Sequence, residues 1–128
     1  MIALVVDDSA AVRGLLVDHL TQLGFQVEQA ANGFEALAKV ASATRLDVVL
    51  LDWSMPGMDG LEALRRVRAE PRCADLPVVM VTPDGELPFM EEALAAGASE
   101  YLMKPFDAQS VLEKLLLLGV DPEQRRTI

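Results

Sequence analysis

The feature that most constrains the fold is a regular alternation between short apolar runs and longer helical patterns. Three runs, Ile2–Val6, Val48–Leu51 and Val78–Val81, are continuous and rich in β-branched residues, which is typical of strands buried on both faces. Phe25–Glu28 alternates apolar and polar residues as an edge strand does, and Glu100–Met103 is a fifth candidate. Strand starts lie about 20–30 residues apart, the length that a parallel crossover needs. The pattern predicts an α/β chain with a five-stranded parallel sheet.

Helical periodicity fills the gaps between these runs. Leucines and valines recur at three- and four-residue steps in the first gap, and Gly24 is placed to end that helix. Pro88 suits the first turn of a later helix that ends at Gly97. The other helix starts each follow a residue whose side chain can cap an N-terminus. These predicted caps are Ser9, Asn32, Asp59 and Asp107.

Length and composition fit one globular domain. The chain has 128 residues, within the usual domain size of roughly 100–150, and 52% of them are hydrophobic against 24% charged. We expect residues 1–119 to form the domain and residues 120–128 to be a polar tail, too short for an output domain. Cys73 is the only cysteine, which excludes an internal disulfide and a cysteine metal cluster.

The charge balance argues against several classes of partner. Eleven basic residues against twenty acidic ones give a net charge of −9, which repels nucleic acid. Arg65, Arg68 and Arg72 lie close to one helical face, which we interpret as a solvated surface rather than a docking patch. No apolar run approaches the roughly 20 residues that cross a bilayer, and no signal peptide is visible. We therefore expect a cytoplasmic protein that binds neither nucleic acid nor membrane.

Polar residues follow four of the predicted strands at the point where each ends. Asp7 and Asp8 follow the first strand, Asp52 the third, Thr82 the fourth and Lys104 the fifth. Ligands of open parallel sheets bind outside the carboxyl ends of the strands, so these side chains should share one crevice. Each residue alone would be an ordinary helix cap, turn residue or surface residue. Their joint placement indicates a functional acidic site.

The residue types at this site favour phosphoryl chemistry. Three neighbouring carboxylates repel one another, so the site should have raised pKa values or hold a cation. Oxygen ligands without a nearby histidine or cysteine favour a hard divalent cation, Mg²⁺ or alternatively Mn²⁺. Lys104 would supply a second positive charge to a phosphoryl group, and Thr82 a hydrogen bond to one of its oxygens. Asp52 is the natural nucleophile for an acyl phosphate.

The segments around these residues resemble the receiver domain of two-component response regulators. The resemblance covers residues 2 to about 118 and implies a flavodoxin-like, doubly wound (βα)5 fold with strand order 2-1-3-4-5. The matching segments are Val5–Ser9, Leu50–Gly60, Val81–Thr82 and Gly97–Phe106.

The resemblance implies a role for each site residue. Asp52 would accept a phosphoryl group from a histidine kinase or phosphotransfer protein. Asp8 and Asp52 would bind Mg²⁺ directly, Asp7 would act mainly through water, and the backbone carbonyl of Ser54 would be a further ligand.

By the same resemblance, Thr82 and Lys104 would sense the phosphoryl group. Tyr101 would change rotamer when Thr82 moves, and the Lys104–Pro105 bond is expected to be cis. One position departs from the family pattern, because Pro83 follows Thr82 where a small residue is usual. Proline fixes φ and removes an N–H from a loop that should move, so we expect slower phosphotransfer and a smaller loop movement.

The predicted function is that of a stand-alone, chemotaxis-regulator-like response regulator, with no enzymatic activity beyond Mg²⁺-dependent self-phosphorylation and self-dephosphorylation. Its output partner would contact the fourth helix, fifth strand and fifth helix of a monomer or weak homodimer. One alternative is a receiver that acts without phosphorylation because Pro83 impairs the site. A phosphatase with an aspartate nucleophile would need a second aspartate where Ser54 stands. A flavin binder would need a phosphate loop where Asp7 and Asp8 stand.

Overall fold

The computed structural model describes residues 1–43, 45–83 and 87–122. Its sheet has five strands in the order β2-β1-β3-β4-β5, and every neighbouring pair is parallel. This order confirms the predicted flavodoxin-like topology. The strands are β1 (Ile2–Val6), β2 (Gln26–Ala30), β3 (Val48–Asp52), β4 (Val78–Thr82) and β5 (Glu100–Met103).

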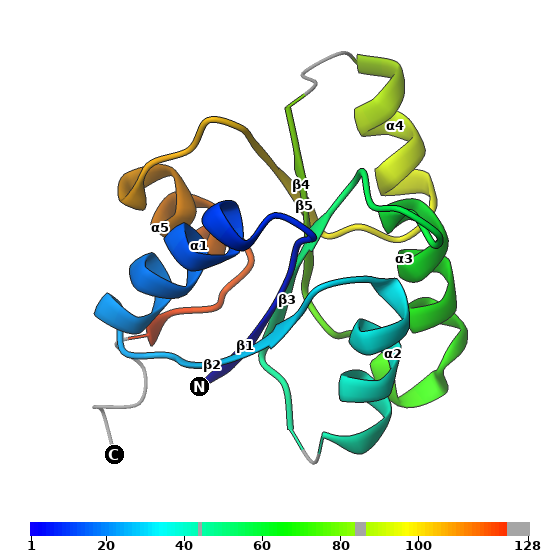
Figure 1. Ribbon diagram of the computed structural model, residues 1–128, viewed down its shortest axis with the longest axis horizontal. Coiled ribbons are helices and arrows are strands. Elements are labelled where there is room, and N and C mark those ends of the chain that lie inside the picture. The colour runs from blue at the N-terminus through cyan, green and yellow to red at the C-terminus, as the bar shows by residue number, and fades with distance from the viewer. Residues whose placement is uncertain (44, 84–86, 123–128) are drawn as a thin grey trace.

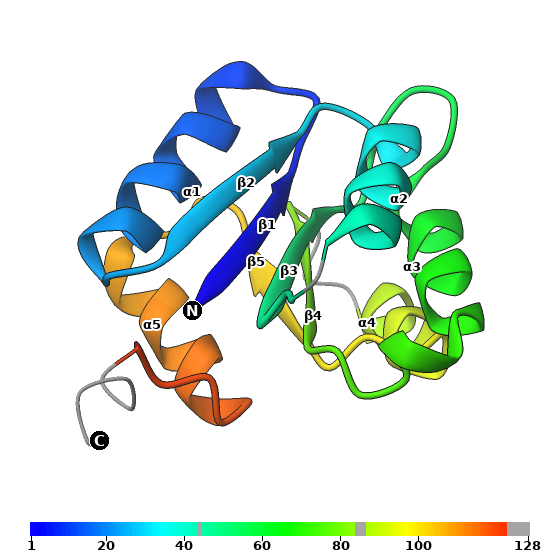
Figure 2. The ribbon, with the colours of Figure 1, turned by 90° about the horizontal axis from the view of Figure 1, so that it is seen from below.

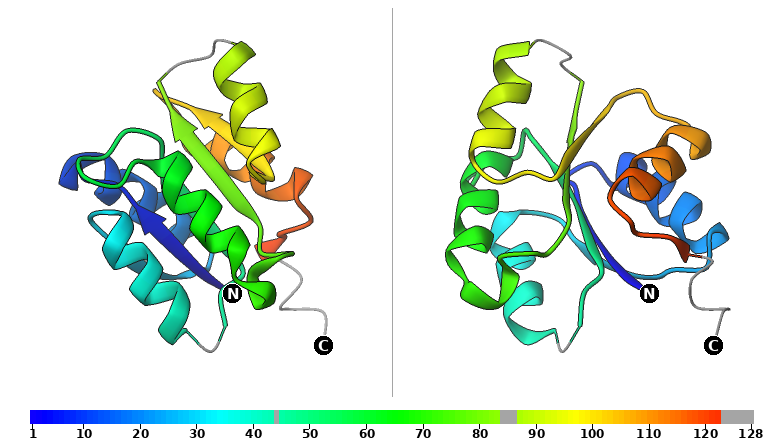
Figure 3. Two further views of the ribbon diagram at one scale, coloured as in Figure 1. Left: turned by 90° about the vertical axis from the view of Figure 1, so that its right-hand side faces the viewer. Right: turned by 180° about the vertical axis from the view of Figure 1, so that it is seen from behind.

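Helices cover both faces of this sheet, as Figures 1 and 2 show. Helices α1 and α5 lie on one face and α2, α3 and α4 on the other, and the views in Figure 3 show the sheet between these two layers. The four predicted caps are confirmed, because each accepts a hydrogen bond from a backbone N–H in the first turn of its helix. The helices are α1 (Ala10–Gln22), α2 (Gly33–Ser42), α3 (Gly60–Ala69), the short 3₁₀ helix η1 (Pro71–Cys73), α4 (Leu87–Ala95) and α5 (Ala108–Leu117).

The two helical layers explain why the central strands are apolar throughout. Alternate residues of β1, β3 and β4 point to opposite faces, and both faces are covered, so these strands are buried along almost their whole length. Leu51 and Met80 belong to the core under α2, α3 and α4, whereas Leu50 and Val79 belong to the core under α1 and α5. The site at the strand ends therefore stands on a rigid base.

The edge strand differs from the prediction at both ends. The predicted strand Phe25–Glu28 is observed as Gln26–Ala30. Phe25 is buried, and its N–H donates to the carbonyl of Leu20, so this residue completes the end of α1. Gly24 before it has a φ of +100°, the left-handed conformation that ends many helices. The apolar residue that started the predicted strand is thus a helix-ending residue.

The interpretation of the arginines as a solvated face is wrong for Arg68, whose side chain is partly buried. Arg68 donates to the carbonyl oxygens of Gly97 at 2.8 Å and Cys73 at 2.7 Å, and to Ser99 Oγ at 3.3 Å. Burial lowers the pKa of its guanidinium. Arg72 is exposed, as predicted, and its guanidinium also donates to carbonyls at the end of α2, among them that of Ala41 at 2.8 Å. Both side chains join elements near the amino-terminal ends of the strands.

Two further predictions concern the ends of the chain and the membrane. Val120, at the start of the predicted tail, is buried in the core under α1 and α5, and residues 123–128 lie outside the described part. The domain boundary at residue 119 stays a prediction. Within the described residues, no helix has both the length and the apolar content that a bilayer crossing requires.

Candidate functional site

Three carboxylates meet at the carboxyl ends of β1 and β3. One oxygen from each of Asp7, Asp8 and Asp52 lies within 4.8 Å of the others. Asp7 is 1% exposed and Asp52 is 3% exposed, whereas Asp8 is exposed to solvent. All three donors are oxygen atoms, which fits a hard divalent cation and not a soft metal.

Lys104 brings the one ammonium group into this cluster. Its Nζ lies 3.0 Å from Asp52 Oδ1 and 3.3 Å from Asp7 Oδ2. The Lys104–Pro105 bond is cis, as expected, and the backbone N–H of Lys104 donates to the carbonyl of Thr82. The end of β5 therefore carries the ammonium to the ends of β1 and β3.

Burial and charge pull in different directions at Asp52. Burial raises the pKa of Asp52, the hydrogen bond from Lys104 lowers it, and the charges of Asp7 and Asp8 raise it, so the pKa is above its ordinary value. For Lys104, burial favours the neutral amine, but the carboxylates of Asp52 and Asp7 together outweigh burial and raise its pKa. Lys104 therefore stays protonated, and its single positive charge balances only part of the negative charge of the three carboxylates.

The loop between β1 and α1 holds Asp7 in place. The N–H of Asp7 donates to the carbonyl of Ala30, and Oδ1 of Asp7 accepts from the N–H of Ser9 at 2.8 Å. A third contact comes from Arg13, whose Nη1 donates to the carbonyl oxygen of Asp7 at 2.7 Å. Sequence reasoning missed Arg13, because its position in α1 does not indicate which acceptor it reaches.

A glycine brings α3 against the backbone of Asp52. A Cβ on Gly60 would collide with the carbonyl oxygen of Asp52 and lie 2.8 Å from the Cα of Trp53. The N–H of Gly60 donates to the carbonyl of Trp53 at 2.8 Å. The loop between them is further fixed by Met55 and Met58, whose side chains are buried. Ser54 lies exposed in this loop, two residues after Asp52.

The residues predicted to sense phosphorylation lie at the neighbouring strand ends. Thr82 is buried and ends β4, and Pro83 after it is exposed. Met80 pairs with Tyr101 and Thr82 with Met103, so these four side chains belong to the face of the sheet that α4 covers. Asp84 and Gly85, which follow Pro83, lie outside the described residues.

Two aromatic contacts report on the same region. The Trp53 ring packs edge-to-face on Phe89 of α4, with ring centroids 5.7 Å apart. Tyr101 is partly exposed, and Lys114 Nζ lies 4.4 Å from its ring centroid. Trp53 thus contacts α4, and Tyr101 of β5 contacts α5.

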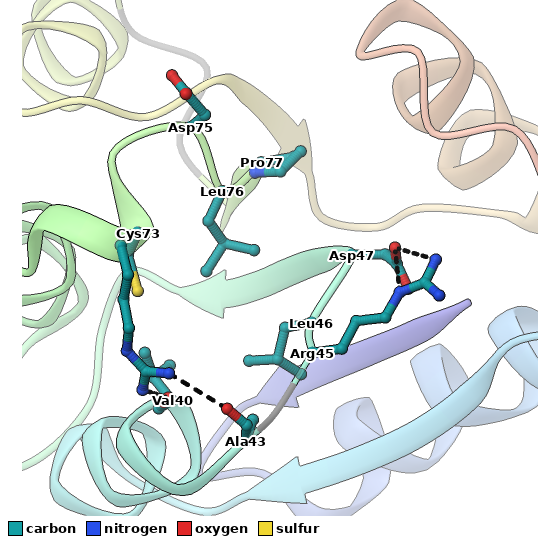
Figure 4. Close-up of a pocket in the computed structure, with 10 residues that line it drawn as sticks. Val40, Ala43, Arg45, Leu46, Asp47, Cys73, Asp75, Leu76 and Pro77 are labelled. Carbon is teal, nitrogen blue, oxygen red and sulfur yellow. Dashed lines mark hydrogen bonds and ion pairs between the residues drawn. The ribbon is translucent and has the colours of Figure 1, made fainter.

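A pocket of about 550 Å³ lies away from this chemistry, near the amino-terminal ends of β3 and β4. Figure 4 shows Leu46 and Cys73 at its wall and the Arg45–Asp47 ion pair at its side. The guanidinium of Arg72 is bonded to backbone carbonyls of α2. Arg45, Asp47 and Arg72 are therefore already paired, which leaves the exposed carboxylate of Asp75 as the one remaining charge among the described residues that line this pocket. The acidic cluster, where several charged groups meet, is the better candidate site.

Comparisons with known proteins agree with the fold. The family model of the response regulator receiver domain matches residues 3–116. The chain is 38% identical over 120 residues to the chemotaxis protein CheY1 of Helicobacter pylori, covering 92% of this chain and 97% of that protein. The receiver domain of response regulators is a module of two-component signalling and not a classical enzyme.

Solved structures show the same likeness. The chemotaxis response regulator CheY4 of Vibrio cholerae superposes with a TM-score of 0.87 at 37% identity, over 91% of this chain and 97% of that one. The receiver domain of the sensor histidine kinase PA1611 from Pseudomonas aeruginosa, solved with a magnesium ion coordinated in its active-site cleft, gives 0.84 at 28% identity, over 92% and 97%. From the sequence match and the shared architecture together, this chain belongs to the response regulator receiver domain family.

Proposed function

We propose that this chain is a single-domain response regulator whose Asp52 accepts a phosphoryl group from a histidine kinase or a histidine phosphotransfer protein. The observation that carries the proposal is the meeting of Asp7, Asp8 and Asp52 with the Lys104 ammonium in one crevice. Asp52 is the best nucleophile of the three, because Gly60 fixes its backbone and burial raises its pKa, which makes its carboxylate more basic.

The donor set fits Mg²⁺. Asp8 and Asp52 would hold the ion directly together with the backbone carbonyl of Ser54, and Asp7 would hold it through water. The receiver domain of PA1611, with its coordinated magnesium ion, supports this assignment. When bound, the ion supplies positive charge that stabilises the phosphoryl oxygens. Mn²⁺ has the same preference for oxygen ligands and is the alternative.

The transfer itself requires few groups from the protein. A carboxylate oxygen of Asp52 forms a bond to phosphorus while the bond between phosphorus and the donor's imidazole nitrogen breaks, and the imidazole leaves with a proton from solvent. Lys104, which now pairs with Asp52 at 3.0 Å, moves its hydrogen bond to a phosphoryl oxygen. Thr82 donates its hydroxyl hydrogen to a second phosphoryl oxygen.

The output follows from the position of Thr82. When Thr82 moves toward the phosphoryl group, Tyr101 on the same face of the sheet changes rotamer, and the surface of α4, β5 and α5 changes with it. Leu94 and Met103 are exposed apolar side chains of α4 and β5, which suits a protein partner. We propose that the chain acts in the cytoplasm as a monomer or weak homodimer.

The test uses Trp53, whose backbone adjoins Asp52 and whose ring contacts α4. Its fluorescence is measured during a Mg²⁺ titration and then during addition of beryllofluoride, which mimics a phosphoryl group. We expect a saturable response to each ligand, and we expect Asp52→Asn to lose the beryllofluoride response. No response to either ligand, with calorimetry in agreement, would leave a receiver that acts without phosphorylation.

A further inference from the structure

We propose that Arg13 is a positioning residue for the acidic site, whose guanidinium holds the Asp7–Asp8 peptide in the orientation that divalent cation binding requires. This inference rests on the proposed function, because it assumes that Asp7, Asp8 and Asp52 bind the ion. It adds to that function a residue that neither contacts the ion nor bears a carboxylate.

The guanidinium of Arg13 joins three segments. Its Nη1 donates to the carbonyl oxygen of Asp7 at 2.7 Å, and its Nε donates to Oε1 of Gln29 at 3.1 Å. Arg13 belongs to α1, and its own N–H donates to the carbonyl of Ser9 at 2.9 Å. Gln29 belongs to the edge strand β2. The loop that carries the carboxylates is thus tied to the helix after it and to the strand beside it.

The bond to Asp7 fixes more than one side chain. The carbonyl of Asp7 and the N–H of Asp8 belong to one planar peptide unit, so holding that carbonyl limits ψ of Asp7 and φ of Asp8 together. Asp7 has further anchors, because its N–H, Oδ1 and Oδ2 bond to Ala30, Ser9 and Lys104.

The Asp8 side chain has no anchors of this kind within the described part of the chain. It is exposed, and no described residue donates a hydrogen bond or forms an ion pair with its carboxylate. The backbone that Arg13 holds therefore sets the position of the Asp8 Cβ, and with it the reach of the carboxylate into the site. Groups that orient metal ligands typically contribute about ten- to hundredfold to metal affinity.

Positioning and charge predict opposite effects on metal affinity. If Arg13 acted only as a nearby positive charge, it would repel Mg²⁺, and its removal would tighten binding. If Arg13 positions Asp8, its removal weakens binding although a repelling charge is lost. The sign of the change therefore separates a positioning role from a purely electrostatic one.

The experiment compares Mg²⁺ dissociation constants, measured by Trp53 fluorescence and calorimetry, for the wild type, Arg13→Met and Gln29→Met. We expect about tenfold weaker binding for Arg13→Met. Gln29→Met keeps the positive charge of Arg13 and removes only the hydrogen bond that Gln29 accepts from its guanidinium. We therefore expect a smaller decrease in Mg²⁺ affinity than in Arg13→Met. Gln29 is exposed, so this variant should fold even if Arg13→Met does not.

Arg72→Met is the matched control. Arg72 also donates to backbone carbonyls, but it lies near the amino-terminal ends of the strands, at the end of the sheet opposite to the acidic site. It should lower the free energy of unfolding without changing Mg²⁺ affinity. Unchanged or tighter binding in Arg13→Met, or an equal loss in Arg72→Met, would overturn the positioning role alone. A wild type that binds no Mg²⁺ would overturn the proposed function as well.

Discussion

At the scale of single residues, the site combines burial with unbalanced charge. Asp7 and Asp52 are almost completely buried, yet the one cation within bonding distance of both is Lys104, among the residues that the structure describes. Such an arrangement opposes folding unless a cation or a phosphoryl ligand completes it. The cluster is therefore better explained by ligand binding than by stability.

This imbalance predicts that Asp52→Asn stabilises the metal-free protein at pH 7. Because the pKa of Asp52 is raised by folding, the folded state binds more protons than the unfolded state between the two pKa values, and stability falls as pH rises through that window. Above the window, the ionised carboxylate costs about 1.4 kcal/mol for each pH unit of the shift. The asparagine variant avoids this cost, although Lys104 loses one partner.

Urea unfolding at pH 7 and at pH 3.5, both with chelator, measures the effect. The advantage of Asp52→Asn should shrink at pH 3.5, below the ordinary carboxyl pKa of 3.8, where Asp52 is largely protonated in both states. Asp18→Asn makes the same chemical change at an exposed position of α1 and should stay within about 0.5 kcal/mol of the wild type. A destabilised Asp52→Asn at pH 7 would show that the ion pair with Lys104 outweighs the burial of charge.

At the scale of elements, Arg68 connects α3, η1 and the loop before β5. It donates to the carbonyls of Cys73 and Gly97 and to Ser99 Oγ, which in turn accepts from the N–H of Val78. We expect Arg68→Met to lower the free energy of unfolding by about 2–3 kcal/mol, because it leaves partly buried carbonyls without a donor.

Arg65→Met is the matched control, because Arg65 lies exposed on the same helix. It should change the free energy of unfolding by less than about 0.5 kcal/mol. Equal losses in the two variants, measured by urea unfolding, would contradict a specific role for the Arg68 contacts.

The loop after β4 carries the second prediction at this scale. Pro83 directly follows buried Thr82 and cannot donate a backbone hydrogen bond. Pro83→Ala should increase the rate of phosphorylation by a small-molecule donor such as acetyl phosphate several-fold, because the loop gains freedom to move toward the phosphoryl group. Rates are measured by Trp53 fluorescence, with Pro71→Ala as the control, because Pro71 is exposed in η1 and lies away from the site. An unchanged rate would show that Pro83 does not restrict the switch.

What the sequence predicts well at this scale is set by local interactions. The caps Ser9, Asn32, Asp59 and Asp107 bond to N–H groups only three residues away, so spacing alone identifies them. The central strands are equally clear, because burial on both faces requires unbroken apolar runs. The carboxylate cluster follows from topology, since parallel strands end at one edge.

The missed features depend on contacts between distant segments. Arg68 reaches Gly97 and Ser99 from another helix, and Arg13 reaches a carbonyl of the preceding loop and Gln29 of β2. An arginine on a helix has the same sequence pattern whether its guanidinium meets water or a carbonyl. The close contact of Gly60 with Asp52 also cannot be predicted from the sequence pattern, because it depends on the conformation of the loop between them.

At the scale of the whole molecule, the amino-terminal and carboxyl-terminal ends of the strands differ in charge and in hydrogen bonding. Near the amino-terminal ends of the strands, Arg68 and Arg72 donate hydrogen bonds to backbone carbonyls and join neighbouring segments. The carboxyl-terminal edge gathers Asp7, Asp8 and Asp52 with a single ammonium. Because the whole chain has a net charge of −9 and three carboxylates gather at this end of the sheet, electrostatic attraction favours cation binding there.

This asymmetry predicts that Mg²⁺ stabilises the protein more than monovalent salt does at equal ionic strength. Salt screens the repulsion within an acidic chain without regard to site, whereas a bound ion adds a free energy that grows with its concentration. At a hundredfold excess over its dissociation constant, Mg²⁺ should add about 2.7 kcal/mol to the free energy of unfolding. Urea unfolding in MgCl₂ and in NaCl of matched ionic strength measures the difference.

Asp8→Asn separates the two effects within the same experiment. Asp8 is exposed, so its replacement should leave the fold intact while removing one carboxylate from the cluster. The variant should keep the stabilisation by NaCl and lose most of the additional stabilisation by Mg²⁺. If wild type and Asp8→Asn gained equally from MgCl₂, the ion would act on the charge of the whole molecule, and the acidic edge would not be a specific cation site.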